Sequence, residues 1–139
     1  MILNAEKQPD AIGHGVWMID IHDPEGSGHT TFSDPDREML EKGTSYHIPF
    51  DMCLNDRIIN LGVVGRCAST THRGLSSVRV QTHCMVMGQG TGTAAALALE
   101  GGCDMHEVPA SKLQKALKDD GVYLEDIPDG KHRGAGTKT

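Results

Sequence analysis

The chain has 139 residues, of which 37% are hydrophobic and only 4% aromatic, and its formal net charge is -6. This length allows about one domain; an acidic chain without a basic stripe is not expected to bind nucleic acid. No apolar run approaches the roughly 20 residues of a membrane helix, and residues 1–10 lack a secretory signal pattern. We therefore expect a cytoplasmic protein whose four cysteines are free thiols.

The first half of the chain predicts two strands. Residues 13–22 (GHGVWMIDIH) alternate in a way that gives a strand with apolar side chains on both faces, which is not typical of a half-exposed edge. Residues 44–50 (TSYHIPF) predict a second strand, which ends at a proline. Between them, Asp-Pro pairs and glycines predict a loop over 23–36, followed by a short helical piece at 36–42.

The second half predicts a strand, a loop and two helices. The apolar run LGVVG at 61–65 fits a buried strand of a parallel sheet, and residues 66–80, rich in Ser, Thr, Gly and Arg, predict a loop. A long helix is expected at 82–100, with Gly101-Gly102 as its stop. A last helix is expected at about 109–120, with a proline in its first turn and Gly121 at its end.

The long helix is apolar on every side. Of residues 84–99 (CMVMGQGTGTAAALAL) only three are polar, and such a helix is expected to be buried all round. Gly88, Gly90 and Gly92 each cost about 1 kcal/mol relative to alanine inside a helix, so packing must offset them. The rest of the chain offers little cover. We expect the covering sheet in a missing N-terminal half or a partner chain; the alternative is a domain folded around its own central helix.

The loop after strand 61–65 is the candidate binding region. It lies at the carboxyl end of the strand, where open α/β sheets bind ligands. The helix that follows presents unpaired N–H groups and a partial positive charge, and Arg66, Arg73 and Arg79 lie around it in sequence. This combination suits an anionic or electron-rich group, such as a phosphate or a reduced flavin ring.

Several motifs in this region carry a resemblance to a known family. They are Tyr46, Ile48-Pro49-Phe50, Val64-Gly65-Arg66-Cys67, Ser69, Thr71-His72, Ser77-Val78-Arg79-Val80, Cys84-Met85, Gly88-Gln89 and Gly92 to Ala98. With these residues, the chain resembles the C-terminal segment of FAD-dependent oxidoreductases with a two-part flavin fold, over roughly residues 10–125. It departs from the family pattern at Gly90-Thr91, where two alanines are usual, at Thr82, where proline is common, and in having no G-x-G-x-x-G after an N-terminal strand.

The resemblance implies an α/β fold class. The chain would be a C-terminal fragment of a partial FAD/NAD(P)-binding, Rossmann-like fold, with part of a β-rich substrate subdomain. Residues 1–59 would form substrate-side strands and loops, residues 60–125 the C-terminal part of the FAD-binding domain, and residues 126–139 a disordered tail.

The resemblance also implies site residues. The start of the long helix would face the isoalloxazine ring of FAD, whose reduced form the helix dipole stabilises. His72 would be catalytic, as a proton donor near the substrate, although it could equally hydrogen-bond its own loop. The residues expected to contact the cofactor are Gly65, Arg66, Ser69, Arg79 and Thr82.

The expected function is hydride transfer between an unknown small-molecule substrate and FAD, in a complex with the missing N-terminal half or a partner chain, without which the fragment is expected to be inactive. A homo-oligomer is also possible. Two alternatives remain open. The chain could be a truncated, non-catalytic interaction module. It could also be a metal-dependent hydrolase built on Asp20, His22 and His47, although a metal site is not our expectation.

Overall fold

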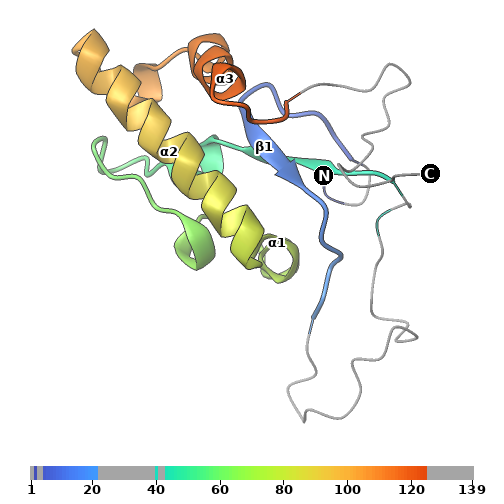
Figure 1. Cartoon of the computed structure of the whole chain (residues 1–139). Coiled ribbons are helices and arrows are strands. Elements are labelled where there is room, and N and C mark those ends of the chain that lie inside the picture. The colour runs from blue at the N-terminus through green and yellow to red at the C-terminus, as the bar shows by residue number, and fades with distance from the viewer. Residues whose placement is uncertain (1, 3–4, 22–39, 41–42, 125–139) are drawn as a thin grey trace.

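The computed structural model describes residues 2, 5–21, 40 and 43–124. Helix α2 (Gln81–Gly101) crosses one face of a small sheet, α3 (Ala110–Asp119) lies beside its C-terminal half, and α1 (His72–Val78) lies near its start (Figure 1). The described part is thus α/β, as predicted. In chain order its elements are β1 (Ala11–Gly15), β2 (Tyr46–Pro49), the 3-10 helices η1 (Asp51–Cys53) and η2 (Gly65–Cys67), α1 (His72–Val78), α2 (Gln81–Gly101), the 3-10 helix η3 (Met105–Glu107) and α3 (Ala110–Asp119).

The sheet of the described residues has two antiparallel strands, β1 and β2, with an irregularity in register between Ala11 and Gly13. The strand predicted at 44–50 is confirmed. The one predicted at 13–22 is wrong in its bounds, because β1 ends at Gly15. The next backbone N–H, that of Val16, donates to His83 Nε2 at 3.2 Å instead of to a strand. Val16 and Trp17 are consequently exposed, against the prediction that both faces would be covered.

The strand predicted at 61–65 is also wrong within the described part of the chain. This segment makes a single antiparallel bridge, between Gly62 and Leu54, and then turns into η2. Leu61 and Val64 are exposed. A strand needs a neighbouring ladder, and no described segment supplies one here. The loop predicted at 66–80 is likewise corrected, because Thr71 caps a seven-residue helix, α1, through its side chain.

The predicted long helix is confirmed as α2, and Gly102 ends it in the left-handed conformation (φ 62°). Its burial within the described residues is one-sided, in line with the expectation that this chain offers little cover. One face packs on β1 and α3, whereas Met85 and Leu99 on the other face are 62% and 84% exposed. The described residues thus leave one apolar face of the helix uncovered.

Two glycines let α2 approach β1 closely. A Cβ built on Gly90 would lie 2.7 Å from Ile12 Cβ, and one built on Gly13 would overlap Val86. Since real Cβ atoms do not come that close, any side chain here would push the helix from the strand. The contact with Ile12 thus explains Gly90, one of the three glycines that lower the helix propensity of α2.

The last helix is confirmed as α3. Pro109 precedes its first residue, Leu113 and Leu117 are buried, and Gly121 follows with a positive φ of 86°. No helix among the described residues is long and apolar enough to cross a membrane. The predicted loop at 23–36, nearly all of the helical piece at 36–42 and the tail at 126–139 lie outside the described residues.

Candidate functional site

The start of α2 carries backbone donors that no side chain caps. The residue before the helix is Val80, which has no side-chain oxygen, and no side-chain cap is formed. The first N–H groups of a helix have no partner within it, and together they act as a partial positive charge. Gln81 and Thr82 in this first turn are exposed. The turn can therefore accept an electron-rich group from outside.

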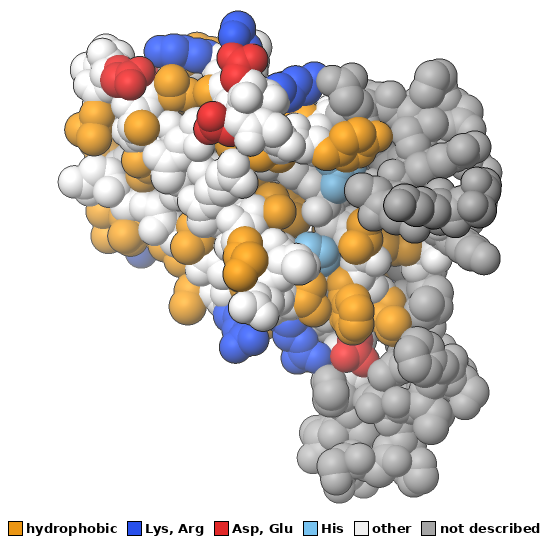
Figure 2. All heavy atoms as spheres, viewed as in Figure 1, with side chains coloured by type: hydrophobic (Ala, Val, Ile, Leu, Met, Phe, Trp, Pro, Cys, Tyr) orange, Lys and Arg blue, Asp and Glu red, His pale blue; other side chains and the backbone are white. Residues whose placement is uncertain are grey.

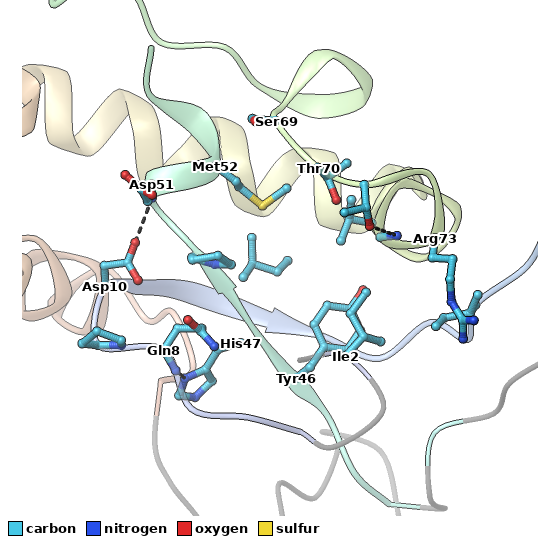
Figure 3. Close-up of a pocket in the computed structure, with 17 residues that line it drawn as sticks. Ile2, Gln8, Asp10, Tyr46, His47, Asp51, Met52, Ser69, Thr70 and Arg73 are labelled. Carbon is cyan, nitrogen blue, oxygen red and sulfur yellow. Dashed lines mark hydrogen bonds between the residues drawn. The ribbon is translucent and has the colours of Figure 1, made fainter. Parts of the chain in front are cut away.

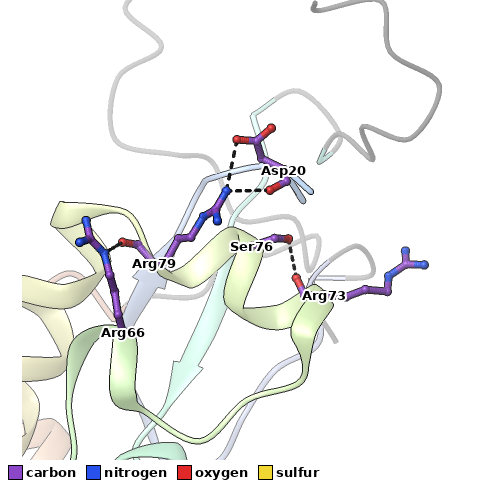
Figure 4. A network of polar contacts seen from close by, with 5 residues as sticks. All are labelled: Asp20, Arg66, Arg73, Ser76 and Arg79. Atoms are coloured by element: carbon purple, nitrogen blue, oxygen red, sulfur yellow. Dashed lines mark hydrogen bonds and ion pairs between the residues drawn. The ribbon is translucent and has the colours of Figure 1, made fainter. Parts of the chain in front are cut away.

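Two arginines lie beside this turn (Figure 4). Arg66 Nε donates to the backbone oxygen of Arg79 at 3.3 Å, which ties η2 to the segment between α1 and α2. Arg79 Nη2 donates to the backbone oxygen of Asp20 at 3.0 Å and lies 3.7 Å from Asp20 Oδ2. The Arg79 side chain keeps 37% of its surface exposed. Two other segments, η2 and the one that carries Asp20, thus hold the two arginines beside the start of α2.

Gly65 brings η2 against the same turn. Its φ of 69° is in the left-handed region, which side chains adopt only with strain. A Cβ at this position would lie 3.7 Å from Cys84 Sγ, an ordinary contact distance. The glycine is therefore required by the backbone conformation. Of the six residues predicted from the sequence, the structure brings four to the start of α2: Gly65, Arg66, Arg79 and Thr82.

The other two predicted residues lie elsewhere. Ser69 donates its backbone N–H to Met52 O at 2.8 Å and lines a cavity beside β2 (Figure 3). His72 is the exposed first residue of α1. None of the hydrogen bonds described around Arg66 and Arg79 reaches Ser69 or His72.

A buried polar network behind the first turn was missed from the sequence. The Tyr46 hydroxyl lies 2.7 Å from Ser77 Oγ and 3.4 Å from His83 Nδ1. Ser77 Oγ donates to Trp17 O at 2.5 Å, and the three side chains are at most 2% exposed. The network joins β2, α1, α2 and the segment after β1. The available signal was a histidine among apolar residues at the start of a helix.

The contacts of His83 determine its protonation state. Its Nδ1 lies 3.1 Å from the backbone oxygen of Ser77, which can only accept. The proton therefore sits on Nδ1, and Nε2 accepts from the Val16 N–H. Burial lowers the pKa of His83, with the bond to Ser77 O acting against that shift. Burial raises the pKa of Tyr46 to about 12, opposed by the hydrogen bond to Ser77. Both groups stay neutral near pH 7, so the network holds the turn in place.

Metal ligation finds no support in the described part of the chain. No group of three or more His, Cys, Asp or Glu side chains there could hold a metal ion. Asp20, a candidate ligand, pairs with Arg79, while His47 Nδ1 accepts from the Gln8 N–H at 3.0 Å. The third candidate, His22, lies outside the described residues.

Comparison with known proteins decides the family. A family model described as FAD dependent oxidoreductase matches residues 1–117. The chain belongs to the FAD-dependent oxidoreductases. The resemblance inferred from its motifs is confirmed, and FAD is the cofactor of the family. No curated protein and no solved structure gives a significant match.

The residues at the start of α2 fit one end of FAD. An uncapped helix start flanked by two arginines suits the pyrimidine edge of the flavin, which becomes electron-rich on reduction. The pyrophosphate of FAD usually needs a glycine-rich G-x-G-x-x-G turn, and this sequence contains none. The residues present would therefore suit the flavin ring of the cofactor better than its pyrophosphate.

Proposed function

We propose that this chain supplies the flavin-facing part of an oxidoreductase in which hydride passes between a small-molecule substrate and FAD. The bound flavin would supply the redox chemistry. Gly65, Arg66, Arg79 and Thr82 would position its ring at the start of α2, in a Rossmann-like setting. The observation that carries the proposal is the uncapped first turn of a 21-residue helix with two arginines beside it.

The charge arrangement supports a role in stabilising reduced flavin. A negative charge near the first turn gains from the helix dipole, typically by about 0.3–1 kcal/mol at an exposed surface and more when partly buried. Arg66 is exposed and held by its Nε, which leaves the guanidinium edge near the turn. Arg79 is anchored on Asp20, whose carboxylate offsets part of its charge. Arg66 would therefore favour the anionic, reduced state most, and Arg79 would add to it more weakly.

His72 and Ser69 remain predictions with separate roles. His72 is exposed, so it is accessible for proton donation to a substrate, and its neighbours Thr71 and Arg73 line the same cavity as Ser69. Ser69 lines this cavity, whereas His72 is only adjacent to lining residues in sequence. We propose that they act toward the substrate, while the arginines act toward the flavin.

The domain assignment is likewise part of the proposal. Residues 1–59 would be the substrate side, and residues 60–125 would pack onto a further part of the FAD-binding domain, supplied by a missing N-terminal half or by a partner chain. The support comes from surfaces that no described residue covers. The run at 61–65 has no ladder, and a Cβ on Gly88 or Gly92 would meet nothing within 4 Å. Hydrophobic side chains also lie along the outward side of α2 (Figure 2).

A flavin titration tests the proposal. The purified chain is titrated with FAD, and quenching of flavin fluorescence reports binding. Replacing Arg66 with Gln removes one charge-assisted contact, which we expect to weaken binding about tenfold. Arg57→Gln is the matched control, because Arg57 is an exposed arginine in the loop that begins with Asn55.

Coexpression with the coding region upstream of Met1 extends the test to the assembly. We expect a co-purified complex that holds FAD and is bleached by a reductant. A colourless complex, together with no quenching by the chain alone, would refute the flavin function and favour the non-catalytic interaction module. Equal weakening by Arg66→Gln and Arg57→Gln would remove Arg66 from the site.

A further inference from the structure

A cavity of about 1000 Å³ runs along β2 (Figure 3). The whole strand lines it, from Tyr46 to Pro49, and the opposite wall comes from Met52 and the segment Ser69–Thr71. Ile19, Ile48 and Val78 give it apolar surface. Its size is at the upper end of the range for small-molecule sites, which are mostly apolar with a few fixed polar groups.

The strand edge in this cavity is poorly suited to a peptide. Phe50 N–H donates to Asp10 O at 3.0 Å, which fixes the alternation of the antiparallel ladder. By that alternation, His47 and Pro49 direct their backbone groups away from β1. Proline has no N–H to donate, so an added strand would find an incomplete ladder. The cavity therefore favours a small molecule over an extended chain.

The two ends of the cavity differ in charge. Asp10 and Asp51 lie together at one end, whereas Thr70 and Arg73 lie at the other (Figure 3). Asp10 Oδ2 accepts the backbone N–H of Asp51 at 2.8 Å, which fixes that carboxylate at the cavity wall. A carboxylate accepts several hydrogen bonds when ionised, so further acceptor sites remain at this end.

The acidic end is also held rigid on its other side. The Gln8 N–H donates to His47 Nδ1 at 3.0 Å, which ties the segment before β1 to the middle of β2. Asp10 is thus held in place twice: by its own bond to the Phe50 N–H and by the nearby bond of Gln8 to His47. Binding groups that are already fixed lose little entropy when a ligand arrives.

We propose that this cavity binds a small organic amine, with its ammonium group at Asp10 and Asp51 and its apolar body against Ile48, Met52 and Val78. Charge complementarity selects the cation, and the apolar middle selects a hydrocarbon or aromatic body over a metal ion. The role of this amine as substrate rests on the proposed flavin function. The binding itself does not.

A titration of the chain with 2-phenylethylamine, followed through the methyl resonances of Met52 and Ile48, tests the proposal. The uncharged analogue 2-phenylethanol is the comparison ligand. We expect saturable shifts with the amine and binding at least about tenfold weaker with the alcohol, because the alcohol forms no ion pair.

Variants assign the charge effect to the cavity. Asp10→Asn keeps an oxygen for the Asp51 N–H, so the fold is retained while the charge is lost. We expect Asp10→Asn and Asp51→Asn each to weaken amine binding about tenfold. Asp119→Asn is the matched control, since Asp119 is exposed on α3 and pairs with Lys115.

Three outcomes would overturn the proposal: equal binding of amine and alcohol, no shift of either methyl group, or an equal effect of Asp119→Asn, which would reveal attraction by net charge alone.

FAD titration of Asp10→Asn separates the amine-binding proposal from the flavin proposal. Unchanged flavin binding with lost amine binding supports the cavity, whereas amine binding without any flavin binding would leave the cavity in place and refute the flavin function.

Discussion

The two faces of α2 have nearly the same composition but opposite environments. The inner face, against β1 and α3, is buried at Met87, Gly90, Ala94 and Ala98. The outer face carries residues at the same three- and four-residue spacing, and they are exposed: Met85, Gly88, Gly92, Ala96 and Leu99. Hydropathy alone cannot tell these faces apart.

Packing distinguishes the two faces where composition does not. A Cβ on Gly90 would overlap Ile12, whereas Cβ atoms on Gly88 and Gly92 would meet nothing within 4 Å. Small residues that cost helix propensity without allowing a close approach have no role within the described chain. This difference is what a helix shaped to pack on further protein would show, in line with the proposed missing half.

The largest expected difference between the faces is in their methionines. Met87 is fully buried, and Met87→Ala should lower the free energy of unfolding by about 2–5 kcal/mol, because it removes packed side-chain atoms and leaves a cavity. Met85 is 62% exposed, so Met85→Ala should change it by less than about 0.5 kcal/mol. Urea unfolding followed by circular dichroism measures both.

The methionine pair also tests whether the outer face is truly open. A cost for Met85→Ala as large as that for Met87→Ala would mean that the outer face is covered in solution by another copy of the chain. Repeating the measurement at several protein concentrations would then show a rise in stability with concentration.

The glycines should give a smaller difference of opposite sign. Gly88→Ala should stabilise the chain by about 1 kcal/mol through helix propensity. Gly90→Ala should destabilise it by about 1–2 kcal/mol, because separating α2 from Ile12 costs more than the helix gains. Thermal unfolding of both variants measures the difference, and stabilisation by Gly90→Ala would contradict the close contact between α2 and β1.

Elements that depend on local sequence patterns were predicted correctly, whereas those that need a partner were not. The strand at 44–50, the long helix with its glycine stop and the last helix followed from local patterns, and all three are confirmed. The run at 61–65 has the composition of a strand, but no described segment pairs with it, and a strand forms only with a partner. The burial of the outer face of α2 also depends on which surfaces are present, so it stays a prediction about a missing half or a partner chain.

For the site, the motifs led to Gly65, Arg66, Arg79 and Thr82, which do gather at the start of α2. They did not reveal the link between His83 and Tyr46. That link joins residues 37 apart in sequence, and it depends on how the strand and the helix pack.

His83, which is buried in the first turn of α2, should make the free energy of unfolding depend on pH. Burial lowers the pKa of His83 below its usual 6.5, so on acidification the unfolded chain takes up this proton first. The contribution of His83 to the free energy of unfolding is therefore complete above pH 6.5 and declines as pH falls toward the folded pKa. Protonation at Nε2 would also place a donor against the Val16 N–H. Tyr46, with a pKa of about 12, does not titrate in this window.

Urea unfolding at about pH 7.5 and about pH 5.5 measures this dependence. His83→Gln should flatten the part of the profile below pH 6.5, at some cost in stability at neutral pH. His106→Gln serves as the control, because His106 is exposed in η3 and should leave the profile unchanged. An identical pH dependence in both variants would assign the effect to other groups.

The smallest expected effect on stability is that of the ion pair between Arg79 and Asp20, beside the start of α2. The Arg79–Asp20 pair has a separation of 3.7 Å and is partly exposed, so Asp20→Asn should cost less than about 1 kcal/mol. The backbone oxygen of residue 20 still accepts from Arg79 Nη2 in this variant, which keeps the arginine near its position. Asp20→Asn should therefore alter flavin affinity far more weakly than Arg79→Gln, which removes the positive charge itself. An equal loss of affinity in the two variants would mean that the orientation of Arg79, and not its charge, is what the start of α2 contributes.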